Sequence, residues 1–281
     1  MIVDAHHHVW DPATSEHAWL DGLPALRRPF GLADYAAVSS AEGVTASVLV
    51  QVLADTAETG EFLALADSNP AVVGVVGWVD LTGPDVGGEI ARLRALPGGN
   101  RLAGLRHLVQ DEPDPAWLDR ADVRRGLRAV GRAGLAYDLL VRPAQWPAAI
   151  RVTAELDDVR FVLDHGGKPD IAAGALEPWA GLVSGLAARP NVVCKLSGLV
   201  TEAGPGWTAT RIAPFTGHLL DCFGPGRLMF GSDWPVCTLA ASYHQVMDLA
   251  RTTLDGRLSP PEQAAVFGGN AVTAYRLHLP G

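Results

Sequence analysis

Short apolar runs rich in β-branched residues recur along the whole chain and predict eight strands. The expected strands cover residues 2–8, 44–53, 72–80, 102–109, 135–141, 159–165, 192–197 and 228–233. Between them lie segments rich in Ala, Leu and Arg with apolar residues at helical spacing, at 57–68, 86–96, 117–133, 144–156 and 176–189. Strand and helix therefore alternate along the sequence.

This alternation predicts an α/β fold, a (β/α)8 TIM barrel that forms a single domain over residues 1–281. Strands that alternate with helices pair in parallel, and eight such units fit a closed barrel better than an open sheet. An open doubly wound sheet is the alternative. The length of 281 residues agrees with a barrel, which commonly has about 250. A last helix over 260–275 is expected to close the barrel from outside.

The first connection, residues 10–33, is long, contains Pro12, Pro24 and Pro29, and carries Trp19 as a large apolar tip. We expect this loop to lie over the C-terminal face of the barrel, where Trp19 contacts the substrate. The alternative is a surface loop whose Trp19 packs on the rim of the barrel.

Composition and charge narrow the range of partners. Hydrophobic residues make up 48% of the chain and charged residues 19%, which suits a well-buried core. The formal net charge of −9 and the lack of a dense Lys/Arg run argue against a nucleic-acid partner, because phosphate binding needs a basic face. We expect a small-molecule ligand, with a homodimer left open as the assembly.

Cysteine usage and hydropathy indicate a soluble, cytoplasmic protein. Cys194, Cys222 and Cys237 are odd in number and form no CxxC pair, which favours free thiols in a reducing compartment. The start of the chain shows no secretory pattern, and no apolar segment reaches the roughly 20 residues that a membrane helix needs. We therefore expect neither a signal peptide nor a membrane partner.

Polar residues at the carboxyl ends of the strands are the candidates for chemistry, because those ends face the active site in this fold. His6 and His8 end the first strand, and their i, i+2 spacing turns both imidazoles to one face while His7 faces the other way. Two converging imidazoles suit a metal ion or an oxyanion. The alternative is a structural histidine pair.

Two further strand ends offer an imidazole and a carboxylate. His165 ends the sixth strand before a tight glycine turn, and Asp233 ends an apolar run in the eighth. Asp164 alternates to the opposite face and is expected to be structural. A structural histidine and a helix-capping aspartate are the alternatives for His165 and Asp233.

Together, His6, His8, His165 and Asp233 suit one Zn2+ ion with a coordination position left for water. Asp233 would accept the proton of the water and pass it to the leaving oxygen, while the metal or the imidazoles polarise a carbonyl. The pattern therefore predicts hydrolysis of an acyl bond.

Other strand ends supply groups that suit a polyol or a carboxylate ligand. They are Gln51 on the second strand, Arg106 and His107 on the fourth, Arg142 after the fifth, and Lys195 with Ser197 on the seventh. The alternative for each cation is a solvated surface charge, which fits Lys195 least because it stands within a short apolar strand.

Five motifs, spread over the whole chain in register, resemble the amidohydrolase-related family 2 of the amidohydrolase superfamily. They are DAHHHVW at 4–10, GLRH at 104–107, DHGGKP at 164–169, CKLSG at 194–198 and FGSDWP at 230–235. The order and the residues of these motifs are most similar to those of the lactonase branch, which includes L-fuconolactonases, L-rhamnonolactonases and 2-pyrone-4,6-dicarboxylate lactonase.

The resemblance implies that His6, His8, His165 and Asp233 occupy the catalytic or metal-site positions of the family. Asp233 would be the general base and Arg106 a substrate-contacting arginine, with His107, Lys195, Trp19 and Trp234 as further expected substrate contacts. The fourth strand has no lysine for a carbamate bridge and the fifth has no histidine, so a binuclear centre is not expected. The resemblance implies either one divalent metal ion, with zinc as the first candidate, or no metal at all, because lactonases of this branch differ in metal use.

These features predict a hydrolase of carbohydrate metabolism that opens a lactone ring, most simply a sugar aldono-lactone. One alternative is nonoxidative decarboxylation of an aromatic or muconate-type acid, which related barrels perform with a similar histidine pair and aspartate. The other is a barrel that binds sugar acids without catalysis. An Asp233→Asn substitution separates the last alternative from an enzyme, because a pure binder keeps most of its affinity.

Overall fold

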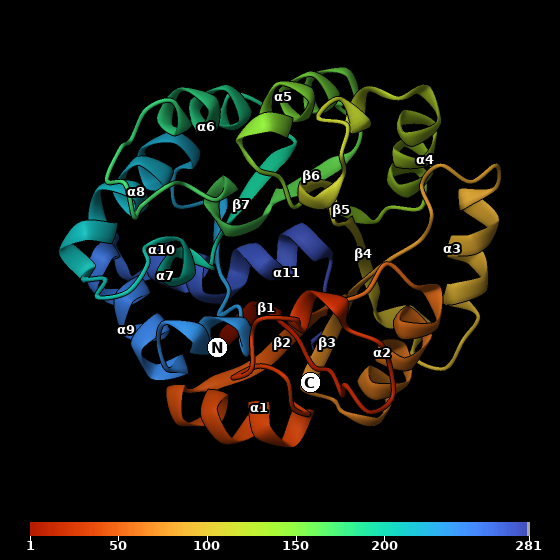
Figure 1. Ribbon diagram of the computed structural model, residues 1–281, viewed down its shortest axis with the longest axis horizontal. Coiled ribbons are helices and arrows are strands. Elements are labelled where there is room, and N and C mark those ends of the chain that lie inside the picture. Colours follow the sequence, from red (N-terminus) through yellow and green to blue (C-terminus); the bar gives the residue numbers. More distant parts are fainter. Residues whose placement is uncertain (280–281) are drawn as a thin grey trace.

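Eight parallel strands follow one another around a barrel in the computed structural model, which describes residues 1–279 (Figure 1). They are β1 (Ile2–His7), β2 (Val44–Val50), β3 (Val72–Gly77), β4 (Leu102–His107), β5 (Ala136–Leu139), β6 (Arg160–Leu163), β7 (Val192–Leu196) and β8 (Leu228–Phe230). Each neighbouring pair in this order is parallel, and a parallel bridge between His7 and Trp234 joins β1 to the turn after β8. The predicted (β/α)8 barrel is confirmed.

Helices surround the barrel, except α11, which lies at the centre of the view and packs against the inner side chains of the strands (Figure 1). They are α1 (Leu32–Ser39), α2 (Thr56–Ser68), α3 (Val86–Arg94), α4 (Ala121–Arg132), α5 (Trp146–Glu155), α6 (Trp179–Ala187), α7 (Leu199–Glu202), α8 (Ala209–Phe223), α9 (Tyr243–Leu254), α10 (Pro260–Ala264) and α11 (Asn270–Tyr275). Among residues 1–279, no helix is both long enough and apolar enough to cross a membrane.

The tail differs from the single helix that the sequence predicts over 260–275. It consists of α10, a π-helical turn over Ala265–Gly269, and α11. The turn packs on the start of β1, and a Cβ at Gly268 would lie only 2.9 Å from the carbonyl oxygen of Met1. Glycine at this position thus allows a close backbone contact that a regular helix with a larger residue could not make.

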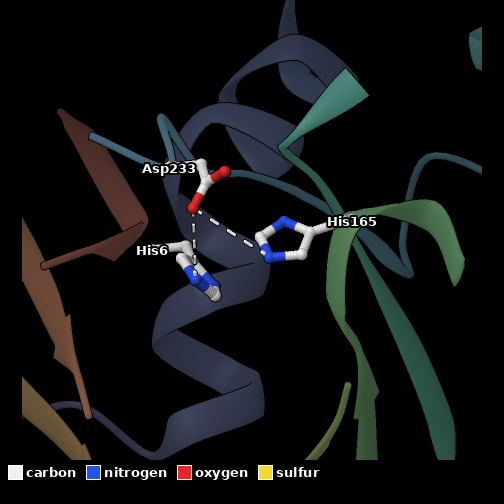
Figure 2. Close-up of side chains that lie close together, drawn as sticks. All are labelled: His6, His165 and Asp233. Carbon is white, nitrogen blue, oxygen red and sulfur yellow. Dashed lines mark ion pairs between the residues drawn. The ribbon is translucent and has the colours of Figure 1, made fainter. Parts of the chain in front are cut away.

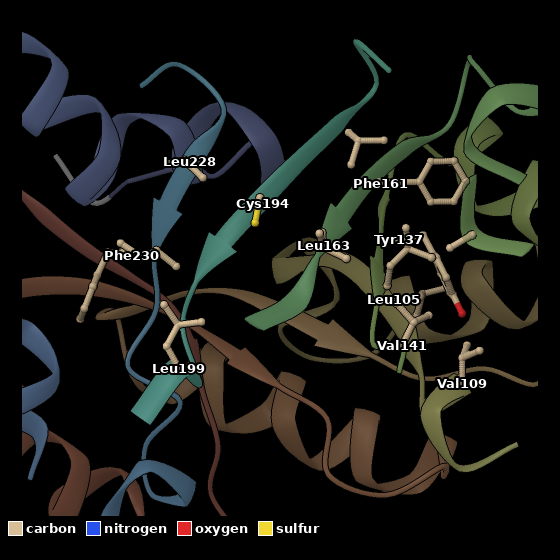
Figure 3. Close-up of a cluster of buried hydrophobic side chains, with 14 of the residues drawn as sticks. Leu105, Val109, Tyr137, Val141, Phe161, Leu163, Cys194, Leu199, Leu228 and Phe230 are labelled. Carbon is tan, nitrogen blue, oxygen red and sulfur yellow. The ribbon is translucent and has the colours of Figure 1, made fainter. Parts of the chain in front are cut away.

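Two apolar layers hold the barrel. The outer layer lies between the strands and the helices and includes Tyr137, Phe161 and Leu228 (Figure 3). The inner layer fills the barrel with smaller side chains such as Val48 and Val162, and residues of α11 pack against it. The interior is therefore a packed core, and ligand access is confined to the ends of the barrel.

A buried carboxylate, Asp4, joins β1 to the turn after β8 and to two outer helices. It accepts hydrogen bonds from the backbone N–H groups of Ser232 (2.8 Å) and His6 (3.1 Å) and from the hydroxyls of Tyr35 (3.0 Å) and Tyr243 (2.9 Å). Burial raises the pKa of Asp4, and the hydrogen bonds only partly oppose that shift. Asp4 thereby fixes the backbone on both sides of the place where the barrel closes.

Replacing Asp4 by leucine should lower the free energy of unfolding by about 3 kcal/mol or more. Four buried donors then lose their acceptor, and each unmet buried donor costs about 1–3 kcal/mol. Tyr243→Phe is the matched control and should cost about 1 kcal/mol, since it removes one hydrogen bond. Urea unfolding of both variants tests this, and equal losses would contradict the role given to Asp4.

Candidate active site

A cavity of about 180 Å3 opens at the carboxyl ends of the strands. Its lining includes the polar side chains of His8, Arg106, His165 and Asp233 and apolar side chains such as that of Trp10. Concave, partly apolar sites with a few converging polar groups are the usual form of small-molecule sites. This end of the barrel is also where barrel enzymes place their chemistry.

The four residues that the sequence singles out come together at the floor of this cavity, where His8, His165 and Asp233 line it and His6 lies fully buried beside them. Asp233 Oδ1 lies 3.5 Å from His8 Nε2, 3.8 Å from His6 Nε2 and 4.0 Å from His165 Nε2. Figure 2 shows His6 and His165 on either side of the Asp233 carboxylate. One ligand atom from each of these three residues lies within 4.8 Å of the others.

His6 on β1 and His8 directly after it face the inside of the barrel, and His7 faces the outside, as predicted. A register shift between Asp4 and His7 in the pairing with β2 accompanies this arrangement. His8 Nδ1 donates to the carbonyl oxygen of Val50 at 2.8 Å, because a carbonyl can only accept. His8 Nε2 is thereby turned toward Asp233, 3.5 Å from its Oδ1.

His165 and Asp233 both have left-handed backbone, with φ of 55° and 57°. Such a conformation costs about 1–2 kcal/mol for a residue other than glycine, and it clusters at functional sites. Around His165 the chain is tightly packed, since a Cβ at Gly198 would lie 2.6 Å from His165 Nδ1. The ring is held by a hydrogen bond of 2.9 Å between its Nδ1 and the hydroxyl of Ser197.

The expectation that Asp164 faces away from the site is wrong. Alternation holds only in an extended strand, but β6 ends at Leu163 and residues Asp164–Gly167 form a 3-10 turn. Asp164 is buried 3.4 Å from His6 and 3.1 Å from Arg106. The left-handed backbone of His165 then brings its own ring to the same site.

Lys195 lies beneath the cavity rather than on its wall, where the sequence analysis expects a substrate contact. Its ammonium is fully buried, 2.5 Å from Asp138 and 3.0 Å from Asp164. Tyr275 of α11 donates to Asp138 from below at 2.7 Å. Sequence analysis missed Asp138, although a carboxylate and a lysine on two apolar strands are a signal for a buried ion pair.

Arg106 lines the cavity, and three hydrogen bonds hold its guanidinium group in place. It donates to the side chain of Gln51 at 2.9 Å, to the Gln51 carbonyl at 2.6 Å and to Asp164 at 3.1 Å. Its Nη1 is 3.4 Å from His6 Nε2. Arg106 therefore presents a fixed positive charge beside the histidines.

The other expected substrate contacts divide into two groups. Trp19 lines the cavity together with Trp10, whose ring meets it edge to face at 5.0 Å. His107 and Trp234 are not among the cavity-lining residues. The His107 ring forms hydrogen bonds with the side chains of Trp78 and Glu112. The Trp234 ring packs against aromatic residues of the core.

Four further residues of the cavity wall have no individual role among the sequence-based expectations, although Lys168 stands in the motif at 164–169. Gln110, Lys168, Thr201 and Glu202 line it from the connections after β4, β6 and β7. Lys168 Nζ lies 3.7 Å from Glu202 Oε1. Thr201 and Glu202 lie in the short helix α7, and none of the four carries a periodic signal, so only their place shortly after strands points to them.

The local electrostatics favour a carboxylate among neutral imidazoles. Burial lowers the pKa of His165 to about 4, and burial together with Lys195 lowers the pKa of His6 well below its usual value. For Asp233, burial raises the pKa, but the neighbouring His165 and His8 outweigh burial and the net pKa is lowered. At neutral pH the site can accept a proton on Asp233 or bind a cation.

This donor set fits one divalent ion. Neutral imidazole and carboxylate are the ligands that zinc takes in catalytic sites, where one position stays open to water. A second group of possible ligands, His6, Asp138 and Asp164, already surrounds the ammonium of Lys195. A cation of the protein itself thus stands where a second ion would bind.

Comparisons with known proteins identify the family of the chain. The profile described as amidohydrolase matches residues 3–277. The chain is similar to the L-fucono-1,5-lactonases of Burkholderia ambifaria, at 39% identity over 99% of this chain and 96% of the relative, and of Burkholderia multivorans, at 39% over 100% and 97%. A crystal structure of an amidohydrolase from Burkholderia multivorans with bound zinc has 39% identity, covers 99% of this chain and 100% of the other, and has a TM-score of 0.94.

Protein loaded with excess zinc and then washed should hold one ion per chain, because the second group of ligands is filled by Lys195. Asp233→Asn should weaken this binding, since an amide is a poorer ligand than a carboxylate. Asp158→Asn, an exposed position, is the control. Elemental analysis measures the ratio, and two ions per chain would contradict the arrangement.

Proposed function

The chain belongs to the amidohydrolase family, and from this we propose that it is a hydrolase that opens a lactone ring, with a sugar aldono-lactone as substrate. The observation that carries the proposal is the Asp233 carboxylate, placed by left-handed backbone among three buried imidazoles at the floor of the cavity. The full-length similarity to two L-fucono-1,5-lactonases supports the substrate class and makes L-fucono-1,5-lactone the first compound to assay.

In the proposed reaction, Asp233 acts as the general base. It takes a proton from water as the water oxygen bonds to the lactone carbonyl carbon. The ring C–O bond then breaks, and the protonated Asp233 returns its proton to the departing alkoxide. The product is an open-chain hydroxy acid, and the aspartate is again a carboxylate.

The remaining residues stabilise charge and exclude water. Negative charge develops on the carbonyl oxygen, and Arg106 offers it a positive charge that is already fixed in place by Gln51 and Asp164. Trp10 and Trp19 form an apolar wall over one side of the cavity. Such a wall lowers the local dielectric and strengthens the electrostatic contacts inside.

We further propose that His6, His8, His165 and Asp233 hold one divalent metal, with zinc as the first candidate. A metal at this position, when bound, polarises the carbonyl and lowers the pKa of water. The zinc-containing relative of known structure supports the choice of metal. The three cysteines are free thiols, which supports a cytoplasmic location. For the oligomeric state we propose a homodimer.

Asp233→Asn should lower kcat for lactone opening by about 10²- to 10⁴-fold, the usual contribution of a general base. Affinity for the product acid should change little, because the amide keeps the shape of the side chain. Asp158→Asn serves as the exposed control. Loss of product binding without loss of kcat would contradict the assignment of Asp233 as the base.

The pH dependence should reflect the buried histidine. Burial lowers the pKa of His165 to about 4, so the neutral ring persists above that pH and is lost as the pH falls through it. A charged His165 ring, 4.0 Å from Asp233, lowers the pKa of that carboxylate and makes it a weaker base. We therefore expect kcat/KM of chelator-treated enzyme, corrected for spontaneous hydrolysis, to stay level from pH 8 to 5 and to fall near pH 4. NMR titration of the His165 ring checks the same value directly, and a midpoint near 6.5 would contradict it.

A further inference from the structure

A second cavity, of about 210 Å3, opens at the amino ends of the strands, on the opposite side of the barrel from the active site. It lies between the starts of β3 and β4, the turn before β5 and the end of α11, where Val73, Leu102, Leu135 and Tyr275 line it. Its volume is no smaller than the 180 Å3 of the active-site cavity. The second cavity can therefore take a small molecule of the size of a sugar lactone.

Positive side chains gather in this cavity. Arg94, Arg101, Arg276 and His278 line it, and no aspartate or glutamate of the described residues does. Within residues 1–279 these three arginines form no ion pair, whereas the neighbouring Arg92 pairs with a glutamate of its own helix. Acidic residues outnumber basic ones in the chain, 31 to 22, so the lack of a carboxylate here does not come from a shortage of them.

The guanidinium groups are held in place by neutral acceptors. Arg94 donates to the carbonyl oxygen of Ala133 at 2.7 Å, and Arg101 donates to that of His278 at 3.2 Å. A carbonyl oxygen fixes a guanidinium without neutralising its charge. Each guanidinium has five N–H donors, so most of the donors of Arg94 and Arg101 stay available to a ligand.

The positive charges also lie close to one another. Burial and the neighbouring charge of Arg276 lower the pKa of Arg160, which stands half-buried at the start of β6. Arg276 itself has left-handed backbone, with φ of 51°, and a Cβ at Gly134 would lie only 2.8 Å from its Nη1. Like charges repel one another, so this grouping costs free energy that a bound anion would offset.

We propose that this cavity is a second binding site, for a small molecule that carries a doubly charged oxyanion, either a phosphate monoester or a dicarboxylate. Planar guanidinium groups bind both through paired N–H donors. Asn100 adds amide donors to the lining, and Leu277 and the Tyr275 ring offer an apolar surface to the carbon skeleton. The site lies at the other end of the barrel from Asp233 and does not depend on the proposed lactonase function.

The unchanged protein offers a test that does not depend on variants folding. Tyr275 is one of four tyrosines in the chain, and the other three line neither cavity. NMR of protein with 13C-labelled tyrosine rings is recorded during separate titrations with inorganic phosphate and with citrate, and a Tyr275→Phe spectrum assigns the signal. We expect a saturable shift of the Tyr275 signal, and the probe that causes it identifies the class of anion. No shift with either probe would overturn the proposal.

Matched arginine variants test whether the guanidinium groups bind the anion. Arg94→Gln and Arg276→Gln should each weaken binding of the active probe about tenfold or more, because each removes hydrogen bonds between charged groups. Arg92→Gln is the control, since it removes the same charge from α3 at an exposed position outside the cavity. Its affinity should equal that of the unchanged protein.

Isothermal titration calorimetry measures the affinities, after thermal melting has shown that each variant is folded. Equal weakening in the control and in the two cavity variants would show a general effect of net charge and overturn the proposal. Unchanged affinity in both cavity variants would overturn it as well. None of these measurements uses a lactone, so failure of the proposed function would be seen separately.

Discussion

Four charged side chains are buried together at the centre of the barrel, and the active site depends on their neutralising one another. Arg106 pairs with Asp164, which neighbours Lys195, which in turn pairs with Asp138. Burying a single ion costs several kcal/mol, so each charge is tolerable only because its partner is in place. Burial raises the pKa of Asp138 to about 6. At Asp164 the effect of burial is outweighed by the neighbouring Lys195, His6 and Arg106, which hold the pKa of Asp164 well below its usual range. This cluster fixes the guanidinium that lines the cavity and supports the His6 ring from behind.

The second requirement is the closure of the barrel between β1 and the turn after β8. The Asp233 N–H donates to the His6 carbonyl oxygen at 2.8 Å, which brings residues from opposite ends of the sequence side by side. Asp4 stabilises both sides of this junction through backbone hydrogen bonds to His6 and Ser232. Asp233 and the histidines are thus placed by backbone contacts, and their side chains need little freedom of their own.

Much of this could be predicted from the sequence because the relevant signals are local. The repeated apolar runs predict the barrel, and the strand ends identify His6, His8, His165 and Asp233. The helices α1, α8 and α9 lie outside the five helical segments named from the sequence, and in α8 Pro214 interrupts the apolar pattern. The position of Asp164 depends on the turn after β6, and the role of Lys195 depends on Asp138, which lies two strands away around the barrel. Neither relation is visible in a local pattern.

The central claim is that Asp233 activates water and does not itself attack the lactone. A single turnover of L-fucono-1,5-lactone in water enriched in 18O tests this claim most directly, with mass spectrometry of both the product and the protein. General-base catalysis predicts 18O in the carboxylate of the product acid and none in the peptide that contains Asp233. An unlabelled product in the first turnover, with 18O in the Asp233 peptide after release, would show a covalent acyl-enzyme and contradict the account.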